Sequence, residues 1–226
     1  MRVNGAAYYN KYRNLQVPQF APPTGTTSGG STAVNANATY KGFELEAEAV
    51  PVEGLTLNAS VGYVDPVYKR FPKGLEGGVI SGGCSAITNP AGATTGQDCA
   101  KIAKFNYFPN TTIGLGASYV LPKTSYGEWS FRTDYAWKSH VYGGTFNLPS
   151  TPFQNSIYQK AYGLLSARIA LSEIPLAGGD TTAQIALYGE NLTNKKYIVQ
   201  GIDYGFMATA VFGDRRTVGI EGKVNF

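Results

Sequence analysis

Three glutamates, Glu44, Glu46 and Glu48, have the residue type and spacing that acid–base chemistry uses, because they occupy every second position of the stretch GFELEAEAV. In a β-strand they lie on one face about 7 Å apart, close to the separation of the two carboxyl groups of inverting glycosidases. Glycoside hydrolysis also needs one carboxyl group that is desolvated. A face with three carboxylates is hydrated, so the sequence predicts an acidic row beside water rather than a catalytic pair.

The other candidates for catalysis or metal binding are weaker. His140 is the single histidine, and no HExxH motif accompanies it. The sequence also lacks a GxSxG nucleophile motif and the glycine-rich GxGxxG and phosphate-loop patterns. We therefore expect neither an enzyme nor a protein that holds a metal or a cofactor.

The two cysteines, Cys84 and Cys99, enclose a segment rich in Gly, Thr and Ala. We predict a disulfide between them, because a zinc site would need further Cys or His ligands; two free thiols are the other alternative. Closing a loop of this length contributes about 3 kcal/mol in the chain-entropy model. A disulfide indicates an oxidising compartment, and we expect it at the tip of the longest loop, on the side opposite both chain termini.

Eight stretches of the chain alternate apolar and polar residues with the period of two that is typical of β-strands. They are residues 2–15, 39–51, 55–66, 108–121, 128–141, 159–172, 181–192 and 215–226. The connections alternate between short turns (51–54, 122–127 and 173–180) and long loops (16–38, 67–107, 142–158 and 193–214). This asymmetry is typical of outer-membrane β-barrels.

The fold class is therefore predicted to be all-β. We expect an eight-stranded antiparallel up-and-down meander that is part of a transmembrane outer-membrane β-barrel, with the sheet open between its first and last strands. In the stretch 128–141, Trp129 and Trp137 mark the two ends of an apolar face, and Arg132 and Asp134 lie on the other face. Each apolar face is about 9–11 residues long, which is enough for a tilted strand to cross a bilayer.

Composition and charge exclude several classes of protein. The chain is 43% hydrophobic and only 15% charged, and its net charge is +4. The basic residues are scattered, with Lys195–Lys196 and Arg215–Arg216 as notable pairs, so we expect no nucleic-acid partner. No apolar run is long enough for a membrane-spanning helix, and MRVNGAAYYN has no apolar segment of the kind found in signal peptides.

Ligand contact is expected from polar residues of the lumen face and from residues of the long loops. The candidates are Arg132, Asp134, His140, Tyr142, Phe146, Arg168, Tyr204 and Phe206. Packing among the loops themselves is the alternative explanation for the loop aromatics.

Three stretches resemble the β-barrel of TonB-dependent receptors. LYGENLTNKKYIVQG (187–201) and FGDRRTVGIEGKVNF (212–226) are similar to the C-terminal end of that family. The matching residues are Asn191, Leu192, Thr193, Lys196 and Tyr197 in the first stretch, and Gly213, Arg215 or Arg216, Thr217 and Phe226 in the second. GFELEAEAVPVEGLTLNASVGYVDPVYKRF (42–71) resembles a hairpin of the same barrel.

The resemblance implies energy-coupled import of a scarce ligand through the outer membrane, such as an iron–siderophore complex, a vitamin or a glycan. In that family a barrel of about 22 strands surrounds a plug, and an N-terminal TonB box contacts the inner-membrane energy complex. Residues 1–226 are accordingly expected to be the C-terminal portion of the barrel, without plug domain and TonB box. TonB would then be a partner only through the missing N-terminal region.

The remaining expected partners are outer-membrane lipid, a small-molecule ligand and the barrel insertion machinery. The resemblance implies that this machinery reads Phe226 as a membrane-assembly signal, and the physical reading makes Phe226 an anchor at the membrane boundary. Two alternatives stay open. One is a stand-alone eight-stranded outer-membrane barrel that acts as an adhesin, an anchor or a lipid-modifying enzyme; the other is a secreted β-sandwich lectin.

Overall fold

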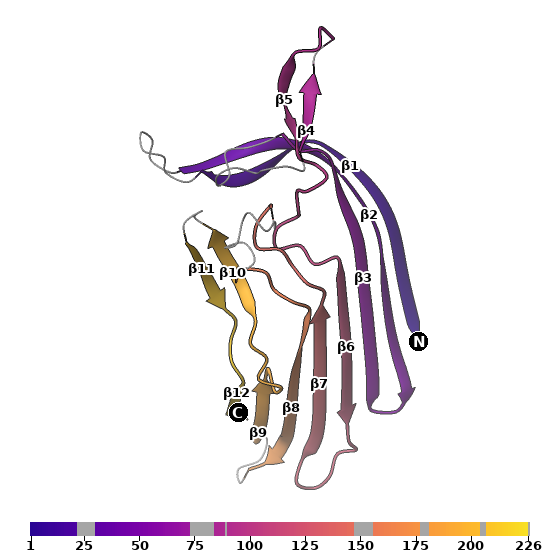
Figure 1. The fold of residues 1–226 in the computed structure, drawn as a ribbon. Coiled ribbons are helices and arrows are strands. Elements are labelled where there is room, and N and C mark those ends of the chain that lie inside the picture. Colours follow the sequence, from indigo (N-terminus) through magenta and orange to yellow (C-terminus); the bar gives the residue numbers. More distant parts are fainter. Residues whose placement is uncertain are drawn as a thin grey trace.

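The computed structural model describes residues 1–21, 30–72, 84–88, 90–146, 156–176, 181–203 and 207–225. Eight strands form one sheet, and its spatial order follows the chain (Figure 1). They are β1 (Arg2–Ala21), β2 (Gly30–Val52), β3 (Leu55–Arg70), β6 (Thr111–Val120), β7 (Glu128–Lys138), β8 (Tyr162–Pro175), β9 (Thr182–Glu190) and β12 (Thr217–Asn225). Among the described residues no helix is long and apolar enough to cross a membrane.

Every pair of neighbouring strands in this sheet is antiparallel, so the predicted up-and-down meander is confirmed. The first and last strands of the sheet order, β1 and β12, do not pair with each other, and the sheet is open as predicted. Both chain termini lie toward the end with the short turns (Figure 1). One parallel bridge, between Asn106 and Tyr142, lies outside the strands.

Two further hairpins lie in segments that were expected to be loops. They consist of β4 (Ser85–Thr88) with β5 (Thr94–Asp98), and of β10 (Ile198–Asp203) with β11 (Ala208–Phe212). Both lie toward the end of the sheet that is opposite the short turns, and β4–β5 projects away from the sheet (Figure 1). Their strands have four to six residues, which is too short for a period of two to be distinctive.

The first two strands are also longer than expected, because a β-bulge interrupts their alternation. The register shifts between Tyr12 and Leu15, and Asn14 has a positive φ of 56°. Two residues of β1 oppose one residue of β2 at this point, so the apolar positions change phase. The strand pair continues beyond the bulge as far as Ala21 and Gly30, although the alternation in the sequence ends near the bulge.

The strand register places apolar residues opposite one another on one face of the sheet and polar residues opposite one another on the other face. Leu115 lies opposite Tyr135, and Tyr135 lies opposite Leu165; on the other face Arg132 lies opposite Arg168. We call the face of Arg132 the concave face, because loop residues pack on it and because Arg168 of β8 reaches across β9 to Glu221 of β12. The face of Leu115 is the convex face.

Apolar side chains on the convex face are exposed rather than buried. Leu115 is 50% exposed, Ile185 57% and Leu187 50%. A soluble sandwich would bury such a face against a second sheet, and contiguous exposed apolar surface of this kind marks contact with a partner or with lipid. The arrangement therefore disfavours the secreted lectin and agrees with a transmembrane barrel wall.

The buried core lies on the concave face, under the loops. Ala36, Ala38 and Tyr68 of β2 and β3 are buried there together with Phe71 and Cys99. Phe105, from the segment between β5 and β6, stacks on Tyr68 with a ring-centroid distance of 3.9 Å and an interplanar angle of 5°. The loop segment thus fills the concave side at one end of the sheet, while the other end stays polar.

We predict that a charge on the convex face destabilises the protein far more than the same charge on the concave face. Leu115→Arg places a guanidinium in the apolar band, which should lower the free energy of unfolding by about 2–4 kcal/mol. Ser60→Arg, on the concave face of the adjacent β3, is the matched control and should have a much smaller effect. Urea unfolding in phosphatidylcholine vesicles measures both, and equal losses would contradict the assignment of the two faces.

Candidate ligand-contact site

Three predicted ligand contacts, Arg132, Asp134 and Arg168, lie together on the concave face, but each forms an ion pair. Arg132 donates to Asp134 through Nε at 2.8 Å and Nη2 at 3.0 Å. Arg168 donates to Glu221 through Nη1 at 3.1 Å and Nη2 at 2.9 Å. Exposed pairs of this kind contribute about 0–1 kcal/mol, so an incoming ligand can replace either partner at little cost.

A hollow of about 400 Å³ lies beside these pairs, toward β1, β2 and β3. Its polar lining on the concave face includes Arg2, Asn4, Glu46, Glu48, Asn58, Ser60 and Asp134. The acidic row therefore borders open space, as the sequence suggested. No ion pair among the described residues involves Glu44, Glu46 or Glu48.

An aromatic cluster lies at the loop end of the concave face, where β7 leads into the following segment. It consists of His140, Tyr142 and Tyr158, whose ring centroids are 5.4–5.7 Å apart. Two hydrogen bonds between the backbones of Val141 and Gln159, 2.9 and 3.0 Å long, bring the segments together. His140 and Tyr142 were predicted ligand contacts, and Tyr158 was not.

A lysine adds positive charge to this cluster. Lys104 Nζ lies 5.5 Å from the ring centroid of Tyr142, within the range of a cation–π interaction. Partial burial and the neighbouring Tyr142 raise the pKa of the Tyr158 hydroxyl, so Tyr158 stays neutral and able to donate a hydrogen bond at physiological pH. The cluster presents aromatic faces, one cation and phenol donors, all half-buried.

A second lysine–tyrosine pair follows along the same wall. Lys138 Nζ lies 4.9 Å from the ring centroid of Tyr162, and Tyr162 stacks on Tyr197 at 4.6 Å. Lys138 continues the concave row of Arg132 and Asp134 by the alternation of β7. The contact between Lys138 and Tyr162 follows from the β7–β8 register, in which the two residues lie opposite each other. The contact between Lys104 and Tyr142 depends instead on how the loops fold back, so the strand pattern could not predict it.

The other candidates are not part of this cluster. Phe146 is 1% exposed and packs edge-on against Phe71, 5.6 Å away, within the buried core. We therefore no longer place Phe146 at the ligand site; it packs among the loops, which was the alternative. Tyr204, Phe206 and the proposed assembly signal Phe226 lie outside the described residues.

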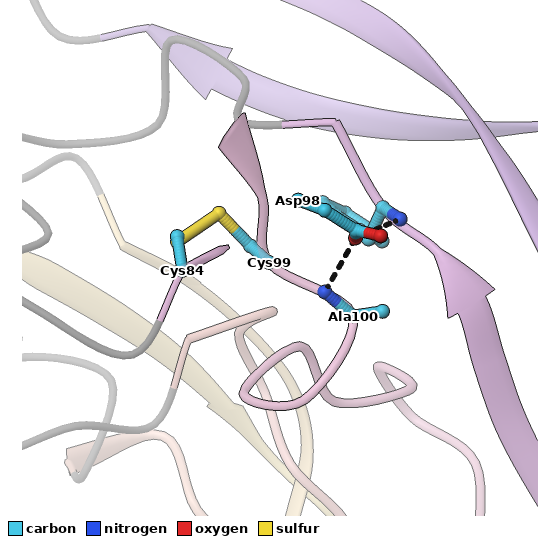
Figure 2. The surroundings of a disulfide bond; sticks show 5 residues. Cys84, Asp98, Cys99 and Ala100 are labelled. Atoms are coloured by element: carbon cyan, nitrogen blue, oxygen red, sulfur yellow. Dashed lines mark hydrogen bonds between the residues drawn. A yellow bond between two sulfur atoms is a disulfide. The ribbon is translucent and has the colours of Figure 1, made fainter. Parts of the chain in front are cut away.

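Cys84 and Cys99 are joined in a disulfide, which Figure 2 shows beside Asp98 and Ala100. The bond closes the base of the β4–β5 hairpin rather than the tip of the loop, because Cys84 directly precedes β4 and Cys99 directly follows β5. The expected position at the tip is thus corrected.

Backbone hydrogen bonds hold this base against the end of β3. Asp98 Oδ1 accepts from the N–H groups of Phe71, at 2.9 Å, and of Ala100, at 3.0 Å. Cys99 N–H donates to the carbonyl of Phe71 at 2.7 Å. The segment that starts at Cys99 is therefore fixed at its origin before it packs into the concave side.

Asn191 is a structural residue whose role the sequence pattern did not reveal. It is 5% exposed, and its Nδ2 donates to the carbonyls of Lys195, at 2.9 Å, and Asp214, at 2.8 Å. Its Oδ1 accepts from the N–H group of Lys195 at 2.8 Å. The side chain thereby joins the turn after β9 to the entry into β12.

Comparison with known proteins identifies the kind of barrel. Residues 1–222 match the family model described as TonB dependent receptor-like, beta-barrel. The ferric yersiniabactin uptake receptor FyuA from Yersinia pestis is structurally similar, with a TM-score of 0.63 and 19% sequence identity; the match covers 99% of this chain and 27% of that one.

Two further solved structures are similar to this chain in fold. The siderophore receptor PiuA from Acinetobacter baumannii has a TM-score of 0.57 at 16% identity and is matched over 98% of this chain and 25% of its own. The copper transporter OprC has a TM-score of 0.57 at 15% identity, with coverages of 98% and 28%. These likenesses show a shared fold, and the chain spans about a quarter of the length of these relatives.

We predict that Asn191→Ala lowers the free energy of unfolding by about 1–3 kcal/mol, because it removes three hydrogen bonds from a buried side chain. Asn194→Ala is the control, since Asn194 is exposed and accepts a single bond, from Arg216 N–H at 3.3 Å. Urea unfolding in vesicles compares the two variants. If Asn194→Ala were as damaging as Asn191→Ala, the assigned role of the Asn191 side chain would be wrong.

Proposed function

Because the chain belongs to the family of TonB-dependent receptor β-barrels, we propose that it is the C-terminal portion of an outer-membrane receptor that imports a metal chelate. The similar structures include receptors named for ferric yersiniabactin and for siderophores, and a copper transporter. The preferred ligand is an iron–siderophore complex. The eight strands supply a segment of the barrel wall, and their concave face borders the transport path.

The open edges support a larger barrel over a stand-alone one. An eight-stranded barrel needs its first and last strands to pair, and β1 and β12 do not. In a bilayer an unpaired strand edge leaves backbone groups without partners, at several kcal/mol for each group. Further strands of a receptor barrel would satisfy both edges. TonB would act through an N-terminal region outside these residues, and lipid would cover the convex face.

The observation that carries the ligand assignment is the aromatic cluster His140, Tyr142 and Tyr158 with Lys104 beside it. Iron(III) chelates with catechol groups combine aromatic rings with net negative charge. Aromatic faces stack with such rings, and lysine attracts the charge. The cluster lies at the end of the long loops, where a ligand from outside arrives first.

We predict that Tyr142→Ala combined with Tyr158→Ala weakens binding of an iron(III) tris-catecholate chelate about tenfold or more, since each lost aromatic contact is worth about 0.5–1.5 kcal/mol. Tyr126→Ala is the matched control, because Tyr126 is 58% exposed in the short turn at the opposite end. Quenching of protein fluorescence by the added chelate measures affinity. Unchanged binding by the double variant would exclude the cluster as the capture site.

We further propose that Phe226 is read by the barrel insertion machinery during assembly. Phe226→Asp places a charge only at the membrane edge, where the cost to a folded barrel is about 0–1 kcal/mol. Folding of the purified protein into detergent should therefore change little, whereas the amount of receptor in the outer membrane of cells should fall sharply. Normal outer-membrane levels of the variant would leave Phe226 as an anchor alone.

A further inference from the structure

Five basic residues from three strands come together next to the apolar band of the convex face. They are Lys11 and Arg13 of β1, Lys41 of β2, and Lys69 and Arg70 of β3, and all five are exposed. We call them the basic strip. Lys69 and Arg70 are adjacent in the sequence, but the other three residues lie far from them or on another strand, so the charges look scattered along the chain. The cross-strand register is what gathers them.

The position of the strip follows from strand pairing. Phe43 lies opposite Tyr63, and their rings are 5.8 Å apart, at the loop-side end of the apolar band. Lys41 lies two residues beyond Phe43 on the same face, which is about 7 Å along the strand. Lys11 lies two residues beyond Tyr9, and its Nζ is 5.6 Å from the Tyr9 ring centroid. The basic strip therefore begins directly outside an aromatic row.

Two bulges bring the other three cations to one place. Arg13 and Asn14 together face Asn37, because the β1–β2 register shifts between Tyr12 and Leu15. On the opposite side of β2, Arg70 pairs with Asn37 and Tyr68 with Ala38, so Lys69 is the additional residue of the second bulge. Such bulges allow two residues of one strand to oppose a single residue of the next.

The strip carries an excess of positive charge. Asp65 pairs with Lys41, with Nζ to Oδ2 at 3.1 Å. The other ion pairs among the described residues involve none of the remaining four cations. Within the described part of the chain, four cationic side chains thus have no carboxylate partner. They lie on a surface that continues an apolar, aromatic-bordered band, which is the arrangement that binds anionic lipid headgroups.

We propose that the basic strip binds the phosphate groups of a lipid headgroup in the outer leaflet of the membrane. The proposal rests on the outer-membrane location in the proposed function, but not on the ligand that is imported. The apolar band below the strip holds the acyl chains, and the aromatic row lies at the boundary. The lysine and arginine side chains extend along this surface and place their charges at the depth of the phosphates.

The test compares two variants that each remove four positive charges. Lys11→Gln, Arg13→Gln, Lys69→Gln and Arg70→Gln together remove the strip and leave the Lys41–Asp65 pair intact. The control replaces Lys195, Lys196, Arg215 and Arg216 with Gln; these residues are exposed in adjacent turns at the same end of the sheet, around Asn191 and Asn194. The intact receptor is placed in phosphatidylcholine nanodiscs with and without diphosphoryl lipid A, and bound lipid A is counted by native mass spectrometry.

We expect the strip variant to bind lipid A at least about tenfold more weakly, because it loses four basic residues near an anionic surface, and we expect the control to bind normally. Equal loss in both variants would overturn the proposal, because net charge alone would explain it. Competition by inorganic pyrophosphate as effective as that by lipid A would overturn it too, since the site would then bind soluble phosphates.

A charge-conserving variant guards against a folding defect. Lys11→Arg, Arg13→Lys, Lys69→Arg and Arg70→Lys should keep lipid A binding, and its loss would contradict an electrostatic site. Capture of the iron chelate is measured separately on the same proteins. Normal chelate capture together with lost lipid binding supports the lipid site at the basic strip. Failed chelate capture together with normal lipid binding contradicts the proposed function but not the lipid site.

Discussion

The antiparallel hydrogen-bond ladder from β1 to β12 is the interaction on which the rest of this structure depends. In hydrocarbon an unpaired backbone N–H or C=O group costs several kcal/mol, so strands that cross a membrane must stay in continuous register. The same register decides which face each side chain occupies, because a slip of one residue would exchange the two faces. The exposed Leu115 and the ion-paired Arg132 are on opposite faces for this reason alone.

The loop end of the sheet depends on a different constraint, since loops rather than a second sheet pack on the concave face in the described part of the chain. The Cys84–Cys99 disulfide and the carboxylate of Asp98 fix the start of the segment that follows β5. Phe105 then stacks on Tyr68, and Phe71 packs against Phe146. This core is made by local anchoring of loops on a sheet, and cross-linking such a loop reduces the entropy of the unfolded chain.

The period of two made the wall predictable from sequence, and the loops show where that signal ends. Strands such as 55–66 and 128–141 were located within a few residues, because their alternation is uninterrupted. The bulge at Asn14 concealed the second half of β1, and the β4 and β10 hairpins are too short to carry a clear pattern. At the candidate site, the alternation of β7 placed Lys138 correctly on the polar face.

Partners that depend on tertiary folding could not be predicted in the same way. Lys104 reaches Tyr142, and Phe146 becomes buried, only because the loops fold back over the concave face. Sequence distance gives no indication of either contact. The basic strip has the same origin on the other face, since Lys11 and Lys69 are close only through their common neighbour β2.

Charge is unevenly distributed around the concave wall, and this bears on how an anion would pass along it. The hollow beside β1, β2 and β3 is bordered by three carboxylates, of Glu46, Glu48 and Asp134, and by one cation, Arg2. Its lining is therefore net negative and disfavours an anionic chelate. Along β7 and β8 the positive charges come first from two lysines, each over a tyrosine ring: Lys104, from the segment between β5 and β6, and Lys138 of β7. The two arginine–carboxylate pairs follow. In the proposed function an anion captured at the aromatic cluster therefore moves along β7 and β8. Because the arginine pairs are exposed and weak, each guanidinium can exchange its carboxylate for the ligand and return to it afterwards, so that binding is transient at every step.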